Sequence, residues 1–526
     1  ILSVLLEMWV KLVTITTLFI CIVEIEPSRI LAASCVATKS HKYVFMPLVE
    51  ALARRGHEVV IITPFKPEKK IANLTELVID NLESVFEEND WFEKAKAIKN
   101  KGFSFTPLSD ILGEIEEEGV RTTLTSVAFK ELYGSEGFDI LIVDAYGSEF
   151  LLPLASKWNA PVISFIPSMF IPASITRRMG GIVDHLAAFG NTEKIPSFVT
   201  RLIAYLIGNL FDIDWSINLG SMIELLMKEL YPNDIMTSLT ELEKMTDLVF
   251  INGHYSLNLA QSLPPNMRNV GGLHCKESED LPQDIEEFIS DGDEGVILFS
   301  LGSAIPSEQM PKQYLDAFAN AFRRLPQKII WRWSGEPFEN VPENVMLRSW
   351  LPQQDIAGHP KTRLLISHGG MLSTTEAICH GIPILGLPFW GDQDANIALA
   401  VRDGYGLKLE WNDLTEDLLY NTITELLNNT QYTRIVKKRQ ELFHDRPMKP
   451  LDEAVYWVEH ILRHGGGQHL SPATRNLNRF QAKMLDVYLF LLGAVSIILI
   501  LIAGSLYALL SIVRRFISPQ LKQKLN

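Results

Sequence analysis

Short runs of continuously apolar residues alternate along the chain with segments that have helical spacing. The first run, 29–37, precedes a segment in which Val49, Leu52 and Ala53 share one helical face, and a second run follows at 58–64. Apolar runs without polar alternation are typical of strands buried on both faces of a parallel sheet. Further runs of this kind lie at 138–145 and 160–167. The pattern therefore predicts a first parallel α/β sheet.

The same alternation restarts after a proline-punctuated segment, 263–290, which we interpret as a linker. New strand-like runs lie at 295–303, 328–334, 363–367 and 382–388. The sequence thus predicts two facing, doubly wound parallel-sheet domains of the Rossmann-like class. Ligands of such sheets bind at the carboxyl ends of the strands.

The predicted organisation follows from these runs and from two longer apolar segments. Its parts are upstream residues and a signal peptide (1–28), an N-terminal α/β domain (29–262), the linker (263–290), a C-terminal α/β domain (291–470), a juxtamembrane segment (471–486), a transmembrane helix (487–513) and a cytosolic tail (514–526).

The two longer apolar segments predict the compartment. Residues 12–23 follow Lys11 and are too few to span a bilayer, so they fit the apolar core of a secretory signal, with Met8 as a plausible start. Residues 487–513 carry no charge over 27 positions, which corresponds to about 40 Å of helix at about 1.5 Å per residue. We expect this segment to cross a membrane.

The residues after 513 predict the orientation of this anchor. Four cations follow the apolar segment: Arg514, Arg515, Lys522 and Lys524. The positive-inside rule then places the tail in the cytosol and the body in the lumen. The two terminal lysines resemble a dilysine retrieval signal of the endoplasmic reticulum, although cations that merely flank the anchor would look the same. The sequons at Asn73 and Asn428 are compatible with a lumenal body.

Composition narrows the choice of partners. A net charge of −15 without a basic stripe argues against nucleic acid, because phosphate contacts need clustered Lys and Arg. Of four cysteines, Cys21 lies in the predicted signal, and Cys35, Cys275 and Cys379 are scattered. They predict neither a disulfide framework nor a metal site. We interpret the segment 170–250 as helices that pack in the ordinary way. The alternative is that their apolar residues form a pocket or a membrane-facing surface.

The stretch 364–396 carries the clearest chemistry. Its first strand ends at His368, two glycines follow up to Gly370, and a helix is expected to begin near Ser373. Bare backbone amides and a helix N-terminus then point at one place, which suits a phosphate group. A capping box formed by Ser373 and Glu376 would explain those two residues without any ligand.

The surroundings of this stretch resemble a known family. The 44 residues from Trp350 to Gln393, with "SWLPQQDIAGHP" and "PFWGDQ", resemble the signature of the UDP-glycosyltransferases, which include the UDP-glucuronosyltransferases. "FSLGS", "VGGLHCK", "LARRGHEVVIITP" and the C-terminal anchor extend the resemblance over nearly the whole chain, in wording closest to invertebrate members. The resemblance implies a GT-B fold and a membrane-bound detoxifying enzyme.

The resemblance also implies roles for individual residues on the donor side. Trp350 would stack on uracil, Gln353 would bind the base or ribose, and Glu376 would accept the ribose hydroxyls. The diphosphate would be held by His368, the Gly370 region with the helix start at Ser373, and Ser303; the sugar would be held by Asp392 and Gln393. Many relatives have Asn where this chain has Leu372, so that contact to phosphate is missing here.

The catalytic pair would come from the first domain. By resemblance, His41 is the general base and Asp144 its carboxylate partner. A neutral imidazole can take the proton of an acceptor hydroxyl, while the carboxylate fixes the tautomer and stabilises the imidazolium. The sugar would then be transferred with inversion, and neither a metal nor a cofactor would be needed. Taken singly, His41 could belong to a helix cap and Asp144 could be an ordinary strand-end carboxylate.

The donor and the acceptor are harder to predict. Asn252 stands where glucuronosyl members carry an arginine, which favours UDP-glucose over UDP-glucuronate. The expected acceptor is a hydroxyl of a small lipophilic molecule, and a homo-oligomer is left open. Two alternatives are a non-catalytic UDP-sugar-binding membrane protein and a nicotinamide-dependent oxidoreductase. The presence of both His41 and Asp144 argues against a non-catalytic protein. The lack of GxGxxG after the first strand argues against an oxidoreductase.

Overall fold

The structure is a computed structural model. It describes residues 26–36, 38–80, 82, 117–181, 183, 197–214, 220–230, 239–257, 260–302 and 305–523. Nearly all of the predicted signal segment, together with Ser303 and Lys524, lies outside the described residues. The chain divides into two units, Ile1–Ser471 and Pro472–Asn526.

The first sheet contains seven parallel strands in the order β3-β2-β1-β4-β5-β6-β7. The strands are β1 (Arg29–Ala33), β2 (Glu58–Thr63), β3 (Leu74–Val78), β4 (Ile140–Asp144), β5 (Val162–Ile166), β6 (Thr246–Ile251) and β7 (Met267–Asn269). The order of the strands reverses between β1 and β4, which pair directly with Ile30 opposite Ile140. A crevice at the carboxyl ends of the strands is expected at such a reversal.

Helix α2 (Lys39–Arg54) shows how the sequence builds this layer. Val49, Leu52 and Ala53 are completely buried in the cluster that covers β1 and β2, as their spacing predicts. The helix ends just before Gly56, whose φ of +98° is a conformation that side chains rarely adopt. The other helical segments around this sheet are α6 (Val127–Tyr133), η1 (Glu149–Leu151), α7 (Leu152–Trp158), α8 (Ala173–Arg178), α9 (Phe198–Asp214), α10 (Gly220–Leu230) and α11 (Leu239–Glu243).

The second sheet contains six parallel strands in the order β10-β9-β8-β11-β12-β13. They are β8 (Val296–Ser300), β9 (Lys328–Arg332), β10 (Val345–Arg348), β11 (Thr362–Ser367), β12 (Ile384–Gly386) and β13 (Gly406–Lys408). The surrounding helical segments are α12 (Gln283–Ser290), η4 (Ser307–Gln309), α13 (Lys312–Arg323), α14 (Gln353–Gly358), α15 (Met371–His380), α16 (Gln393–Asp403), η5 (Trp411–Asp413), α17 (Glu416–Asn428) and α18 (Thr430–His444). The strand order reverses between β8 and β11, so both sheets have a reversal of strand order near their centre.

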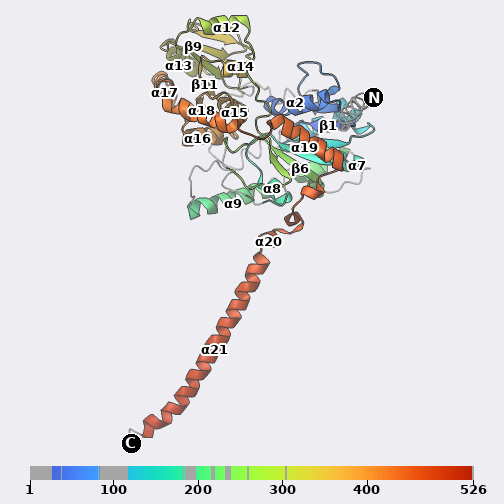
Figure 1. Cartoon of the computed structure of the whole chain (residues 1–526), viewed down its shortest axis with the longest axis vertical. Coiled ribbons are helices and arrows are strands. Elements are labelled where there is room, and N and C mark those ends of the chain that lie inside the picture. Colours follow the sequence, from blue (N-terminus) through green and yellow to red (C-terminus); the bar gives the residue numbers. More distant parts are fainter. Residues whose placement is uncertain are drawn as a thin grey trace, which may run out of the picture. The chain divides into compact units, whose positions relative to one another are not determined.

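The segments that connect the two sheets contribute to both. The predicted linker contains β7, which extends the first sheet, and α12, whose Ile285 and Ile289 pack in a cluster with the second. Helix α19 (Pro450–His464) comes after the second sheet but returns to the first, where it lies beside α2 (Figure 1). Its Val458 is fully buried in the same cluster as Leu52. The η6 turn (Gln468–Leu470) then closes the first unit.

The second unit consists of η7 (Ala473–Asn476), α20 (Arg479–Ala482) and the long helix α21 (Leu485–Gln523). Asn478 caps α20 through a capping box with Gln481. Residues Leu485–Arg515 of α21 contain an 18-residue window with a mean hydropathy of 2.7, and the span is long enough to cross a bilayer. The prediction of one apolar, membrane-length helix at the C-terminal end is confirmed, with bounds slightly wider than 487–513.

Candidate active site

His41 and Asp144 meet at the strand reversal of the first sheet. Asp144 is the last residue of β4, and His41 lies in the first turn of α2 rather than in the preceding loop. Nδ1 of His41 is 2.7 Å from Oδ2 of Asp144. The other carboxylate oxygen accepts a hydrogen bond of 2.9 Å from the backbone N–H of Tyr146. The carboxylate is thus fixed on both sides, and it orients the imidazole.

The electrostatics of this pair suit a base. Burial by itself disfavours the charged form of His41, but the charge and hydrogen bond of Asp144, with a smaller contribution from Asp392, raise its pKa above the ordinary value. The side chain of Asp144 is only 2% exposed, whereas that of His41 is 24% exposed. Since Nδ1 faces the carboxylate, Nε2 is the nitrogen left to take a proton from a substrate.

The second sheet contributes Asp392 to the same region. Asp392 caps α16, and its Oδ2 accepts a hydrogen bond of 3.1 Å from Nδ2 of Asn396. Burial is the main cause that raises its pKa, while Asn396 and the nearby His41 oppose that rise. His41 and Asp392 belong to different sheets, and each affects the pKa of the other.

Gln393 follows Asp392, and its side-chain oxygen is hydrogen-bonded to the backbone. Its Oε1 accepts hydrogen bonds from the backbone N–H groups of Phe389 (2.8 Å) and Trp390 (3.3 Å). The carbonyl end therefore holds the loop before α16 in place. Among the described residues, Nε2 of Gln393 has no hydrogen-bond partner, so the amide nitrogen remains available as a donor.

The glycines around His368 lie at the start of α15 as expected, but the helix begins earlier than predicted. Helix α15 begins at Met371 with Gly370 as its N-cap, two residues earlier than Ser373. The capping box of Ser373 and Glu376 is therefore wrong: the hydroxyl of Ser373 donates to the carbonyl of Gly370 at 3.0 Å and lies 2.8 Å from that of Ser367. The N-cap has no side chain, so the helix N-terminus stays open to a ligand.

The ring of His368 is held between two glycines. A Cβ added to Gly302 or to Gly370 would lie 2.5 Å from an atom of this ring, closer than side chains can approach. Burial first, and then the charge of Arg332, lowers the pKa of His368 to about 4. The neutral imidazole is therefore the favoured form of His368 at pH 7. It can still donate one hydrogen bond.

Arg332 supplies the cation that sequence reasoning missed. It is the last residue of β9, and its guanidinium donates to the backbone carbonyl of Gly302. Its charge acts on His368, which places it beside the glycine-lined site. The signal was present in "KIIWRWS", because a cation at the carboxyl end of a buried parallel strand lies where ligands bind.

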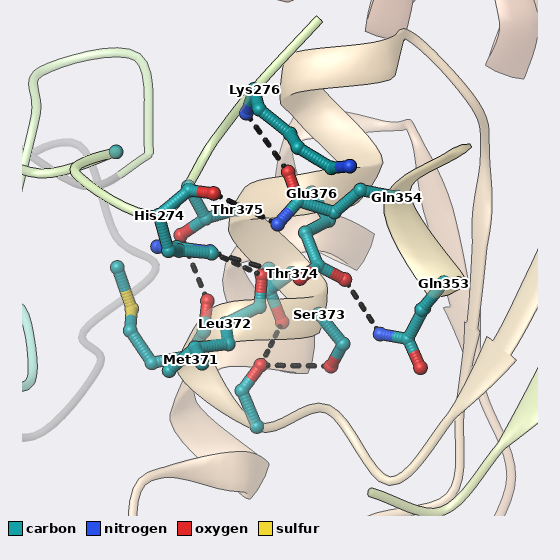
Figure 2. A network of polar contacts seen from close by, with 12 residues as sticks. His274, Lys276, Gln353, Gln354, Met371, Leu372, Ser373, Thr374, Thr375 and Glu376 are labelled. Carbon is teal, nitrogen blue, oxygen red and sulfur yellow. Dashed lines mark hydrogen bonds and ion pairs between the residues drawn. The ribbon is translucent and has the colours of Figure 1, made fainter. Parts of the chain in front are cut away.

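An exposed indole lies just before α14, and a buried carboxylate lies on α15. Trp350 is 68% exposed, so its ring face is free to stack on a base. Gln353 opens α14 and donates from Nε2 to Oε2 of Glu376 at 2.5 Å (Figure 2). Burial raises the pKa of Glu376 to about 7, and the bond from Gln353 opposes this rise only in part.

His274 is a further neighbour of Glu376. Its Nε2 lies 3.3 Å from the carbonyl oxygen of Leu372 and 3.9 Å from Oε1 of Glu376 (Figure 2). Burial lowers the pKa of His274 to about 4, so this contact is not an ion pair at neutral pH. The sequence analysis noted His274 only as part of "VGGLHCK".

Two positions that depart from the family pattern have structural explanations. Leu372 packs against the hydrophobic cluster of the first sheet that contains Leu52. Asn252 is fully buried; its Nδ2 donates to the carbonyl of Pro167 at 2.8 Å, and its Oδ1 accepts from the N–H of Gly272 at 3.4 Å. Its amide thus bonds backbone groups, and the glucose donor inferred from this position stays a prediction.

Comparisons with known proteins agree with this geometry. The sequence model of the family described as "UDP-glucoronosyl and UDP-glucosyl transferase" matches residues 161–523. UDP-glycosyltransferase UGT5 of Dactylopius coccus is 33% identical over 479 residues, which is 89% of each chain. UDP-glucuronosyltransferase 2B14 of Oryctolagus cuniculus is 31% identical over 488 residues, covering 87% of this chain and 89% of its own.

Solved structures support the fold alone. CalG4, the calicheamicin glycosyltransferase, superposes with a TM-score of 0.56 at 19% identity, over 83% of this chain and 99% of its own. Two parallel sheets with a reversal in each are therefore arranged as in GT-B glycosyltransferases. With the family match over most of its length, the chain belongs to the UDP-glycosyltransferases, enzymes that transfer a sugar from a UDP-sugar.

Proposed function

We propose that the protein transfers a hexosyl group from a UDP-sugar, with inversion, to a hydroxyl of a small lipophilic acceptor. The observation that carries this proposal is the 2.7 Å contact of His41 with Asp144, at the strand reversal of one sheet and within electrostatic reach of Asp392 on the other. A base on one side and a sugar-binding carboxylate on the other suit a reaction between two substrates.

The proposed reaction follows from the contacts. Nε2 of His41 takes the proton of the acceptor hydroxyl, and the oxygen attacks the anomeric carbon while the bond from that carbon to the diphosphate breaks. The imidazolium that forms is stabilised by Asp144. The departing UDP carries negative charge toward the open N-terminus of α15, the N–H of His368 and the guanidinium of Arg332. Attack from the side opposite the leaving group inverts the anomeric centre.

The donor is held by the groups of the second sheet. In this proposal Trp350 stacks on the base, Gln353 and Glu376 bind the ribose, and Gly370 with Ser373 shapes the diphosphate site. Asp392 and the free amide nitrogen of Gln393 bind the sugar hydroxyls. Ser303, which lies outside the described residues, keeps its expected role at the diphosphate as part of the proposal. No step of this scheme uses a metal or cofactor.

Glucose is the favoured sugar on two grounds. One relative, of Dactylopius coccus, is named UDP-glucosyltransferase 2 and is 32% identical. Among the described residues, the groups that shift the pKa of Asp392 besides burial are Asn396, His41 and its own backbone, with no Lys or Arg to pair with a glucuronate carboxylate. Other relatives are named UDP-glucuronosyltransferases, so both donors must be tested side by side.

An apolar wall beside the base supports a lipophilic acceptor. Tyr146 lies 6.3 Å from His41 between ring centres, and it packs on a cluster of buried aliphatic residues. That cluster contains Ala145, Ile166, Ile175, Met179, Val249, Ile251 and Met267. In this proposal the apolar body of a phenol or alcohol rests against the ring of Tyr146, with its hydroxyl toward His41.

The localisation is also a proposal. A membrane-anchored enzyme with its body in the lumen of the endoplasmic reticulum, a short cytosolic tail and glycans at Asn73 and Asn428 fits the signal-like segment, the cations after 513 and the sequons. Protease protection of the body in intact microsomes, together with removal of glycans by an endoglycosidase, would test this orientation. Digestion of the body from the cytosolic side would contradict it.

The decisive experiment measures products. Membranes that contain the full chain receive a panel of phenols and alcohols with UDP-glucose or UDP-glucuronate, and the products are identified by mass and by anomeric configuration. We expect β-linked glucosides from the α-linked donor. Products made only from UDP-glucuronate would overturn the donor assignment, and retained configuration would overturn the mechanism. A chain that binds UDP but forms no product with any acceptor would support the non-catalytic alternative instead.

A further inference from the structure

The side chain of Tyr146 lies beside the proposed base, and its hydroxyl has no part in the proposed reaction. The backbone N–H of Tyr146 donates to Oδ1 of Asp144 at 2.9 Å, and its ring centre lies 6.3 Å from that of His41. The hydroxyl donates to the carbonyl of Phe170 at 2.5 Å and lies 2.8 Å from the hydroxyl of Ser168. One residue thus contacts both the carboxylate of the proposed pair and the segment that follows β5.

Hydrogen bonds within this segment complete the contact. The hydroxyl of Ser168 accepts from the N–H of Phe170 at 3.1 Å, and its oxygen also lies 3.1 Å from the carbonyl oxygen of the same residue. Burial raises the pKa of Tyr146, and the hydrogen bond with Ser168 opposes this rise. The charges of Asp392 and Asp144 add to the rise. The phenol of Tyr146 is therefore protonated at neutral pH and acts as a donor to the segment.

Segment 168–170 also packs on residues of the second sheet. Met169, at its centre, is 1% exposed and belongs to the apolar cluster that contains Met371, the first residue of α15. Phe170 is partly buried and packs against the same cluster. Apolar packing on one side and the hydroxyl of Tyr146 on the other therefore fix the place of this segment.

We propose that Tyr146 is a positioning residue for the acceptor, because its hydroxyl holds segment 168–170 in place as one wall of the acceptor site. This inference rests on the proposed function and deepens it, since the wall belongs to the site of the same reaction. A phenol that lies along the ring of Tyr146, with its own hydroxyl toward His41, meets the backbone of Phe170 at the hydroxyl end of that ring. Loss of the hydrogen bond frees the wall and weakens acceptor binding, but it leaves the base, its carboxylate and the donor site unchanged.

Tyr146→Phe tests the hydroxyl alone, because it keeps the aromatic ring and the backbone N–H to Asp144. In membranes that contain the full chain, with naphthol and phenol as acceptor probes, we expect the acceptor KM to rise about 3–10-fold, as for the loss of one hydrogen bond. The kcat, the donor KM and the acid limb of the pH profile should stay unchanged. A purely structural role would lower the Tm without this split between acceptor and donor KM. Tyr456→Phe, which changes an exposed tyrosine of α19, should behave as the wild type and is the matched control.

Ser168→Ala breaks the same contact from the other side and should also raise the acceptor KM. The double variant with Tyr146→Phe should exceed the larger single effect by less than about twofold, because both changes release one segment. Single effects that multiply, a parallel rise in the donor KM, or an acceptor KM of Tyr146→Phe equal to that of the wild type would overturn the inference and leave the proposed function intact. A wild type that glycosylates neither probe would refute phenols as acceptors and this inference with them.

Discussion

Both sheets have a reversal of strand order, but the histidines associated with the two sheets have pKa values shifted in opposite directions. We call the first sheet with its helices the acceptor half and the second the donor half. At its reversal, the acceptor half places a histidine whose pKa is raised by a carboxylate partner. The donor half places His368 and His274, whose pKa values are lowered to about 4, and Glu376, whose pKa is raised to about 7.

The pKa values differ because His41 has a charged partner, whereas the groups of the donor half do not. His41 and Asp144 are buried together, and their mutual interaction outweighs desolvation. The groups of the donor half are buried without a full counter-charge, so each moves toward its neutral form. The proposed diphosphate site is therefore lined by amides, neutral rings and the cation Arg332, whereas the pair of His41 and Asp144 is proposed to serve proton transfer. Four predictions test this division, from the largest expected effect to the smallest.

Loss of the base should be the most severe change. His41→Ala should lower turnover by about 10²–10⁴-fold, the usual contribution of a general base, and should leave UDP binding unchanged because the donor half is intact. Turnover and calorimetric UDP binding are the measurements. His469→Ala, which changes an exposed histidine away from both reversals, should retain activity and serves as the matched control. Equal turnover of His41→Ala and the wild type would contradict the assignment of His41 as the general base.

Asp144→Asn should lower turnover less, by about 10–100-fold, and should move the pH profile. Asp144 raises the pKa of His41, and only the neutral imidazole accepts a proton. Activity of the wild type therefore falls as pH drops through this raised pKa. Without the carboxylate the pKa falls, and the acid limb of the profile should shift to lower pH. An acid limb that stays in place would show that Asp144 does not govern the titration of His41.

Glu376→Gln tests the buried carboxylate of the donor half. Losing hydrogen bonds from the ribose to a charged group costs about 1.5–3 kcal/mol, so the KM for the donor should rise about 10–100-fold while the acceptor KM changes little. The ionised form is the better acceptor of hydroxyl protons. Wild-type affinity for UDP should thus increase as pH rises through about 7, whereas the variant should be flat.

The same variant has an opposite effect on stability. A carboxyl whose folded pKa is raised loses folding free energy as pH increases from its unfolded value toward the folded one. Glu376→Gln should therefore melt above the wild type at pH 8, and the gap should shrink at pH 5. Thermal unfolding at the two pH values is the measurement, and a gap that widens toward pH 5 would contradict the assigned burial of charge.

Asn252→Ala should have the smallest effect on chemistry. Its amide bonds only backbone groups, so its loss should lower the free energy of unfolding by about 1–3 kcal/mol. The ratio of turnover with UDP-glucose to that with UDP-glucuronate should stay unchanged. Measuring this ratio beside thermal unfolding distinguishes the two roles. A large change in the ratio would restore Asn252 as a determinant of the donor.

The sequence predicted much of this molecule, for reasons that differ between the halves. The parallel sheets follow from local apolar runs, and the donor residues from one contiguous stretch around His368 and Glu376. The pair of His41 and Asp144, 103 positions apart, came from the family resemblance, because nothing local shows that two strand ends will be adjacent.

Features set by tertiary packing were missed or misassigned. The start of α15 at Met371 depends on a capping glycine without a side-chain bond, so the nearby Ser and Glu suggested a false cap. Neutral His368 and structural Asn252 result from burial by distant segments.

The return of α19 to the acceptor half limits how the enzyme can be recombined with its relatives. Arg55, just after α2, donates to both carboxylate oxygens of Glu459 on α19, and His57 lies 3.6 Å from the same carboxylate. A chimera that exchanges only the residues before the linker would set a foreign α2 against the native α19. Exchanging acceptor specificity therefore requires two crossovers. Residues 450–464 must come from the same parent as the N-terminal half, although the residues that precede them in the chain belong to the donor half.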